Sequence, residues 1–204
     1  MTKLRKAHWE AVYETKSPNE LSWTQKTPYV SIEFIHDSEI KTDARIIDVG
    51  GGDSLLVDHL LSSGFENITV LDISAKSLER AKKRLGERAK NVKWIVSDIT
   101  EFKPKGKYDL WHDRATFHFL TSDKDIETYQ SLVNEYVTNT LIIGTFSKDG
   151  PMKCSGLEIK QYDQEELTDI FGAKFQRGRC IIVNHETPFK TKQSFTFCKF
   201  AVSE

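Results

Sequence analysis

The chain's fold is decided by the stretch Ile46-Ile47-Asp48-Val49-Gly50-Gly51-Gly52-Asp53-Ser54, in which a short β-branched run ends at three consecutive glycines. The apolar run predicts a buried strand over residues 44–49. Glycine allows a sharp turn and a close approach of the backbone to a ligand. A helix that begins near Ser54 would direct its free backbone N–H groups toward that ligand. We therefore expect a strand, a ligand-binding turn and a helix, in that order.

The same order of strand and helix repeats along the chain. We predict strands at 44–49, 68–73, 92–96, 108–112 and 141–146, and helices at about 54–63, from Ser74 onward, at 124–136 and at 165–171. Such alternation produces parallel strands with right-handed crossovers. The last two strand-like runs, 180–183 and 194–200, have no helix between them and predict an antiparallel hairpin. The expected fold class is α/β, a doubly wound, mostly parallel sheet with an antiparallel C-terminal edge hairpin.

About forty residues precede the first strand, and they look helical and aromatic. Thr27 is a candidate helix cap, with Pro28 at the first helical position. Trp9 and Trp23 combine apolar area with a polar ring atom, which suits either an anchor on the sheet or a lid over a small ligand. We interpret residues 1–43 as a helical N-terminal extension and 44–204 as the body of one structural domain.

Composition narrows the classes of partner. The formal net charge is −1, which gives no electrostatic reason to expect a nucleic acid or an anionic membrane as partner. A basic run at Lys82-Lys83-Arg84 lies on a predicted helix, where such runs are usually solvated. No apolar run approaches the roughly twenty residues that span a bilayer. We expect a cytoplasmic protein.

Cysteine and histidine usage gives two further expectations. Cys154, Cys180 and Cys198 stand far apart and are odd in number, which indicates reduced thiols. The six histidines are scattered, and none forms a metal-ligand spacing with a second histidine or a cysteine. We therefore expect no metal site.

Acidic residues at the ends of successive strands indicate the kind of ligand. Asp72 ends the second strand about twenty residues after the glycines, where a carboxylate can accept hydrogen bonds from both ribose hydroxyls. Asp98, with the adjacent amide of Ile99, ends the third strand, where it can contact an adenine edge. Parallel sheets bind ligands at this rim. These residues predict a cofactor that contains a nucleoside.

Two residues separate the candidate cofactors. A dinucleotide-binding turn needs a third glycine where this chain has Leu55. Asp53 places a negative charge at the mouth of the helix, where it would repel a pyrophosphate and tolerate a sulfonium and an amine. We therefore favour S-adenosylmethionine over NAD.

In the glycine turn and the strand-end acids, the chain resembles a class I, seven-stranded, Rossmann-like S-adenosylmethionine-dependent methyltransferase. The resemblance extends from the glycine turn to the last strand. The resemblance implies that the cofactor-binding residues include Asp48, Gly50, Gly51, Gly52, Asp53, Asp72, Ile73, Asp98, Ile99 and Trp23. S-adenosylhomocysteine would be the product. One departure is visible, because Val137-Thr138-Asn139-Thr140 replaces the usual Pro-Gly-Gly turn before the fifth strand.

The acceptor side is expected just after the fourth strand. Asp113-Arg114-Ala115-Thr116 resembles an element of protein-lysine methyltransferases and an element of thiopurine-type thiol methyltransferases. His112 is a candidate base, Asp113 could orient it or a substrate amine, and Arg114 could hold a substrate carboxylate. Each of the three could equally have a structural role.

The preferred interpretation is a methyltransferase that acts on nitrogen, sulfur or oxygen of a small molecule or a protein side chain. Two alternatives remain open, an NAD-dependent oxidoreductase and a non-catalytic cofactor-binding or partner module. The acceptor and the oligomeric state cannot be read from the sequence.

Overall fold

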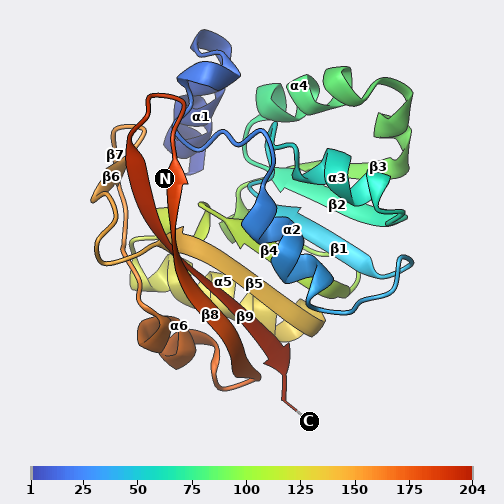
Figure 1. Cartoon of the computed structure of the whole chain (residues 1–204), viewed down its shortest axis with the longest axis vertical. Helices are drawn as coiled ribbons and strands as arrows, with labels where there is room; N and C mark the ends of the chain where they lie inside the picture. Colours follow the sequence, from blue (N-terminus) through green and yellow to red (C-terminus); the bar gives the residue numbers. More distant parts are fainter. Residues whose placement is uncertain (1, 204) are drawn as a thin grey trace.

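The computed structural model describes residues 2–203 as a twisted sheet with helices on both faces (Figure 1). Along the chain the elements are α1 Thr2–Thr15, η1 Pro18–Glu20, α2 Tyr29–His36, β1 Arg45–Val49, α3 Leu56–Ser62, β2 Asn67–Asp72, α4 Ala75–Leu85, η2 Gly86–Asn91, β3 Val92–Val96, η3 Ile99–Glu101, β4 Tyr108–Arg114, η4 Phe117–Phe119, α5 Asp123–Tyr136, β5 Val137–Phe146, β6 Lys153–Cys154, β7 Leu157–Glu158, α6 Gln164–Phe171, β8 Phe175–Glu186 and β9 Lys192–Val202.

The main sheet has seven strands in the order β3-β2-β1-β4-β5-β9-β8. The strands from β3 to β5 pair in parallel, whereas β9 runs antiparallel to both β5 and β8. The order reverses between β1 and β4, so the carboxyl ends of these two strands form the switch point where such sheets bind ligands. The predicted fold class, including the edge hairpin, is confirmed.

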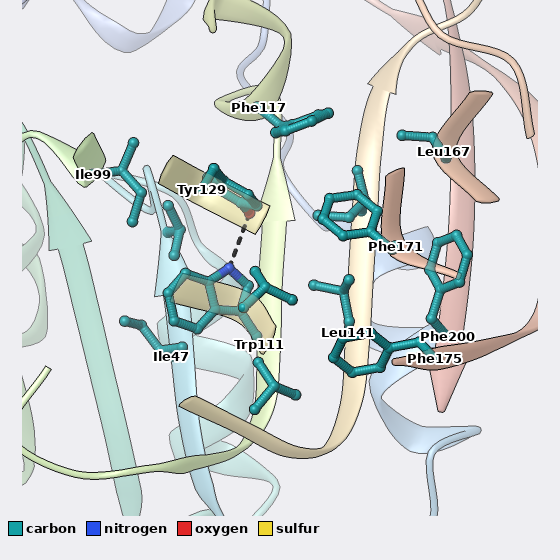
Figure 2. Packing of buried hydrophobic residues seen from close by; sticks show 14 of the residues in the cluster. Ile47, Ile99, Trp111, Phe117, Tyr129, Leu141, Leu167, Phe171, Phe175 and Phe200 are labelled. Carbon is teal, nitrogen blue, oxygen red and sulfur yellow. Dashed lines mark hydrogen bonds between the residues drawn. The ribbon is translucent and has the colours of Figure 1, made fainter. Parts of the chain in front are cut away.

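Alternating side chains place a hydrophobic cluster on each face of the sheet, because successive residues of a strand point to opposite sides. In β1, Ile46 packs with α2, α3 and α4, while Ile47 packs on the side of α5 and α6. Figure 2 shows the cluster on the side of α5 and α6, in which the indole nitrogen of Trp111 donates to the hydroxyl of Tyr129 at 2.9 Å. Helices therefore cover both faces of the sheet, and the rim of the sheet remains accessible to ligands.

Several element boundaries differ from the prediction. The fifth strand was predicted at 141–146, but β5 begins at Val137, directly after α5. Val137 and Thr140 are buried, and the Thr138 hydroxyl donates to the carbonyl of Tyr108 at 3.1 Å, so tertiary contacts hold this segment in the sheet. Helix α2 begins at Tyr29, with Pro28 rather than Thr27 in the capping position.

The loop after β5 contains a short hairpin. In it, Lys153 and Cys154 pair with Glu158 and Leu157. Gly156 adopts a φ of +79° at its turn. Strand β8 is also longer than predicted and extends from Phe175 to Glu186, with a register shift between Arg177 and Cys180.

The cysteine prediction is wrong for two of the three residues. Cys180 and Cys198 lie opposite each other in the β8–β9 pair and are joined by a disulfide. Only the hairpin register brings together two residues that are 18 positions apart. Cys154 is a buried free thiol.

No helix within residues 2–203 has the length and apolar character needed to cross a membrane.

Candidate functional site

A cleft opens at the carboxyl ends of β1 to β4 and is covered by the N-terminal segment. The space between its lining atoms, with the open solvent at its mouth included, is about 770 Å³. Its lining residues come from three regions: Arg5, Trp9, Tyr13 and Trp23 from the N-terminal segment; Gly50, Leu71, Asp72, Ile73, Ser97, Asp98 and Ile99 from the rim of β1 to β3; and Arg114, Ala115, Thr116, Phe119, Leu120 and Cys154.

The glycine turn lies at the centre of this cleft. Gly50 has a φ of +67°, and its amide donates to the carbonyl of Leu71 at 2.7 Å. A side chain at Gly50 would collide with Thr116. Gly52 has a φ of +48°, and a Cβ there would lie 3.0 Å from Asp72 Oδ2 and 2.9 Å from the hydroxyl of Tyr13. Glycine is therefore required both by the backbone conformation and by the narrow space beside Asp72.

Asp72 ends β2 with its carboxylate at the floor of the cleft. Its Oδ1 accepts a hydrogen bond from the Ser74 amide at 2.7 Å. Burial raises the pKa of this carboxyl group to about 7, against the hydrogen bonds that stabilise its charged form. The cleft therefore contains a carboxylate that gains from hydrogen-bond donors supplied by a ligand. Ile73 lines the cleft next to it.

Asp98 follows β3, and its carboxylate lines the cleft as that of Asp72 does. Its Oδ1 accepts hydrogen bonds from the amide and the hydroxyl of Thr100, at 2.9 and 2.8 Å. Its Oδ2 is buried and has no hydrogen-bond partner within residues 2–203. The nearest cation is Arg5, whose Nη1 lies 3.9 Å away. Buried polar atoms are rarely left unpaired, so Oδ2 is a candidate acceptor for a ligand. Ile99 lines the cleft beside it.

Aromatic side chains from the N-terminal segment cover the cleft. The ring of Trp9 contacts Trp23 and Phe119 edge to face, with centroids 5.6 and 5.0 Å apart. The carboxylate of Glu10 accepts hydrogen bonds from Ser74 and from the first amides of α4, and so attaches α1 to the helix that follows Asp72. Trp23 is therefore placed at the cleft, as expected from the sequence.

Asp48 and His112 lie beneath an adjoining cleft on the side of α2. Asp48 Oδ1 is 2.7 Å from His112 Nδ1, and His112 Nε2 is 2.9 Å from the Ser31 hydroxyl. This second cleft is also lined by Gly51 and Asp53. Asp53 is 3.5 Å from Arg80, and burial raises its pKa. The structure thus places Asp48, Asp53 and His112 next to the first cleft rather than in its lining.

Asp113 points to the opposite face of the sheet, because it follows His112 in the same strand. Its Oδ1 accepts from the amides of Thr116 and Phe117, and its Oδ2 accepts from the Tyr129 hydroxyl at 2.8 Å. Burial raises the pKa of Asp113 to about 6. Asp113 therefore stabilises the turn after β4 and lines neither cleft.

Arg114 is the third residue of this predicted group, and it borders both clefts. Its Nη1 donates to the carbonyl of Trp23 at 3.0 Å. The guanidinium carbon lies 5.0 Å from the centre of the Phe195 ring. Burial lowers the pKa of Arg114 to about 10. The structure separates the three predicted acceptor-side residues, and only Arg114 lines the cleft under Trp23.

Arg5 lines this cleft and was not among the residues predicted from the sequence. Arg5, Trp9 and Tyr13 are spaced four apart on α1, so their common face was a signal available in the sequence. Cys154 lines the cleft, and burial raises its pKa to about 11, which keeps the thiol protonated. His185 Nε2 lies 2.7 Å from the Ser22 carbonyl.

Asp109 lies near the start of β4, at the opposite end of this strand from the cleft. There it accepts a hydrogen bond from the Arg45 amide at 2.8 Å. Within the described part of the chain, no group of three or more His, Cys, Asp or Glu side chains is arranged to hold a metal ion.

The comparisons with known proteins agree with this geometry. Residues 46–136 match the family model of a methyltransferase domain. The chain is 32% identical over 118 residues to a malonyl-[acyl-carrier protein] O-methyltransferase of Ilyobacter polytropus, over 57% of this chain and 44% of that protein. It is 24% identical to EEF1A lysine methyltransferase 2 of Danio rerio, over 85% of this chain and 76% of that protein.

A solved structure is similar over nearly the whole chain. The 1,6-didemethyltoxoflavin-N1-methyltransferase of Burkholderia thailandensis, with bound 1,6-didemethyltoxoflavin and S-adenosylhomocysteine, superposes with a TM-score of 0.73 at 15% identity. The match covers 99% of this chain and 88% of that chain. By contrast, the chain spans less than half the length of the malonyl-[acyl-carrier protein] O-methyltransferases that it matches.

Proposed function

We propose that this chain, which has the class I methyltransferase fold and a methyltransferase domain at residues 46–136, transfers a methyl group from S-adenosylmethionine to an acceptor. The observation that carries the proposal is the cleft in which Gly50, Asp72 and Asp98 meet at the ends of β1, β2 and β3. S-adenosylhomocysteine would be the product.

The side chains of the cleft fit the cofactor. Asp72 offers a carboxylate to the two ribose hydroxyls, and the space beside it exists because Gly52 has no side chain. The unpartnered Oδ2 of Asp98 would accept a hydrogen bond from the adenine side, next to the amide of Ile99. Asp48, Gly51 and Asp53 would shape the adjoining region that receives the amino-acid end of the cofactor.

When bound, the cofactor supplies a methyl group activated by a positively charged sulfur. The protein's part is to align the acceptor with that methyl group and to exclude water. Trp9, Tyr13 and Trp23 cover the cleft and serve the second purpose. We propose that His112 removes a proton where the acceptor carries one, since Asp48 fixes its ring beside the cleft. Asp113 would act by positioning the turn at Thr116.

The acceptor class stays open at this level of the proposal. By their names, one of the relatives given above methylates a malonyl-[acyl-carrier protein], and the other methylates a lysine of EEF1A. A small molecule and a protein side chain are therefore both reasonable acceptors. We also propose a cytoplasmic location, as the sequence predicts, and no nucleic-acid partner.

Calorimetric titration with S-adenosylhomocysteine tests the cofactor. We expect micromolar binding by the wild type and a loss of about 1–3 kcal/mol in Asp72→Ala, as for hydrogen bonds to a charged group. Asp43→Ala is the matched control, because Asp43 is exposed and lies before β1 at the opposite end of the strands. A folded wild type that does not bind, or equal weakening in both variants, would contradict the proposal.

Labelled methyl donor would then identify the acceptor class. Incubation with a lysine-bearing protein extract and with panels of small thiols and small acids separates the alternatives. Transfer to protein alone, or to small molecules alone, selects between them. Binding of S-adenosylhomocysteine without transfer to any of these would favour the non-catalytic module.

A further inference from the structure

Arg114 is a partly buried cation without an acidic partner among the described residues. No carboxylate oxygen of residues 2–203 lies within 4.0 Å of its guanidinium, although Arg5 and Arg84, which also line the first two clefts, each pair with an aspartate. Nη1 donates to the Trp23 carbonyl, but Nη2 is buried and has no hydrogen-bond partner. An uncompensated buried charge is costly, so it is retained where a ligand pairs with it or a function requires it.

The surroundings of Arg114 leave its charge unneutralised. The acid that interacts with it most is Asp48, which is hydrogen-bonded to His112. Burial outweighs the effect of Asp48 and lowers the pKa of Arg114, yet that pKa stays near 10, so the guanidinium is charged at neutral pH. Burial and the charge of Arg114 together lower the pKa of His118 to about 3 and also lower that of His185. Both histidines are therefore neutral, and the local potential is positive.

The position of Arg114 connects the cofactor cleft to a route for a second molecule. A third cleft lies between residues 24–30 and 183–190, and it is lined by His185, Phe195 and Phe197 among others. Of the described residues that line the cofactor cleft, Arg114 alone also lines this third cleft. None of the glycine-turn residues or the strand-end acids reaches it.

We propose that Arg114 binds a carboxylate of the methyl acceptor, so that the enzyme methylates a small carboxylic acid that enters through the third cleft. A guanidinium matches a carboxylate with two parallel hydrogen bonds, and the unpartnered Nη2 is available for one of them. The Phe195 ring holds the guanidinium in place by stacking. This proposal rests on the proposed function and adds the chemical class of its acceptor.

The other anion that could reach Arg114 is the carboxylate of the cofactor itself. The two occupants differ in which ligand loses affinity when the guanidinium is removed. We therefore compare Arg114→Met, which keeps the length of the side chain, and Arg114→Lys, which keeps a charge without the planar fork. Arg88→Met is the control, because Arg88 is half-exposed and lines none of the three clefts.

The first measurement is calorimetric titration of each protein with S-adenosylhomocysteine. We expect Arg114→Met to bind it within threefold of the wild type. The second titrates the S-adenosylhomocysteine-loaded proteins with malonate, succinate, citrate and benzoate, and with their methyl esters as neutral probes. We expect at least one acid to bind the wild type with a Kd below 1 mM, at least tenfold weaker binding to Arg114→Met, intermediate binding to Arg114→Lys, and no binding of the esters.

Three outcomes would overturn the proposal. Loss of S-adenosylhomocysteine binding in Arg114→Met would assign the guanidinium to the cofactor. Equal binding of acids by Arg114→Met and the wild type would place the acid elsewhere. Failure of all four acids to bind a wild type that does bind S-adenosylhomocysteine would remove the acid-acceptor class and leave the methyltransferase proposal intact. If the wild type does not bind S-adenosylhomocysteine, the proposed function itself fails.

Discussion

The Nδ1 atom of His112 lies 2.7 Å from Oδ1 of Asp48, and both side chains are buried between β4 and β1. This contact joins the glycine-turn strand to the strand that leads to the acceptor side. It is also a buried interaction whose loss leaves a carboxyl group without its partner. The contact therefore has a measurable effect on stability, whatever part His112 takes in proton transfer.

We expect His112→Phe to lower the free energy of unfolding by about 1–3 kcal/mol, the usual cost of leaving a buried polar group without its hydrogen-bond partner. Urea denaturation followed by circular dichroism measures this change. His36→Phe is the matched control, because His36 is exposed at the end of α2, and it should change stability by less than about 0.5 kcal/mol. Equal stability of His112→Phe and the wild type would show that the contact does not stabilise the fold.

Gly52→Ala should weaken binding of S-adenosylhomocysteine by at least about tenfold, because the new methyl group would lie 3.0 Å from Asp72 Oδ2. Gly86→Ala separates this steric effect from backbone strain. Gly86 also has a positive φ, +58°, but no atom lies within 4 Å of its Cβ position. Both variants should lose about 1 kcal/mol of stability, and only Gly52→Ala should lose binding. Equal binding by the two variants would be inconsistent with a crowded site at Gly52.

The affinity for S-adenosylhomocysteine should rise with pH through the pKa of Asp72 and level off above about pH 8. Burial raises the pKa of Asp72 to about 7 in the folded protein, so the carboxyl group is largely neutral at pH 6. Ribose hydroxyls donate to the ionised form, and binding should therefore strengthen about tenfold between pH 6 and pH 8. Asp72→Asn should bind weakly and without this pH dependence. A flat profile in the wild type would contradict the assignment.

The same shift has the opposite effect on the protein without ligand. In the unfolded chain Asp72 ionises near its ordinary pKa of 3.8, whereas in the folded chain it holds its proton up to about pH 7. The unfolded state therefore binds fewer protons between these values. Stability from this group is fully present below about pH 4 and is lost as the pH rises toward 7. Asp72→Asn should accordingly be more stable than the wild type at pH 8 in the absence of ligand.

Reduction of the Cys180–Cys198 bond should lower the free energy of unfolding by about 2–3 kcal/mol, as expected for a crosslink that closes a loop of 18 residues. Urea denaturation with and without dithiothreitol measures the difference. Cys154→Ala should show the same difference, since Cys154 is the free thiol, and Cys180→Ser should show none. An unchanged midpoint on reduction of the wild type would mean that the crosslink does not stabilise the β8–β9 hairpin.

The order of strands and helices could be predicted because hydrophobic period and glycine positions are local properties. Ser74, for example, caps α4 as its position before an amphipathic run predicts. The start of β5 at Val137 could not be predicted in this way. Contacts with β4, rather than local conformational preference, hold Val137 and Thr138 in the sheet. The Cys180–Cys198 pair depends in the same way on a hairpin register that the sequence does not display.

Some residues of the candidate site could likewise be predicted from the sequence, and others could not. Gly50, Asp72 and Asp98 stand at strand ends that a parallel sheet necessarily brings to one rim, and the cleft contains all three. His112, Asp113 and Arg114 are consecutive, but the alternation within β4 sends Asp113 to the far face. That alternation was available from the sequence, whereas the unpaired Nη2 of Arg114 required the three-dimensional packing around it.

The carboxylate of Glu10 belongs to α1, yet it caps the first amides of α4 at Ala75 and Lys76. Any movement of α1 that uncovers the cleft therefore leaves those amides open to solvent. The rate at which these amides exchange hydrogen for deuterium therefore measures how often α1 moves away from the cleft. Ligand entry and the exchange protection of α4 are therefore coupled. Binding of the cofactor would increase the protection of the first amides of α4, even where the cofactor does not contact that helix.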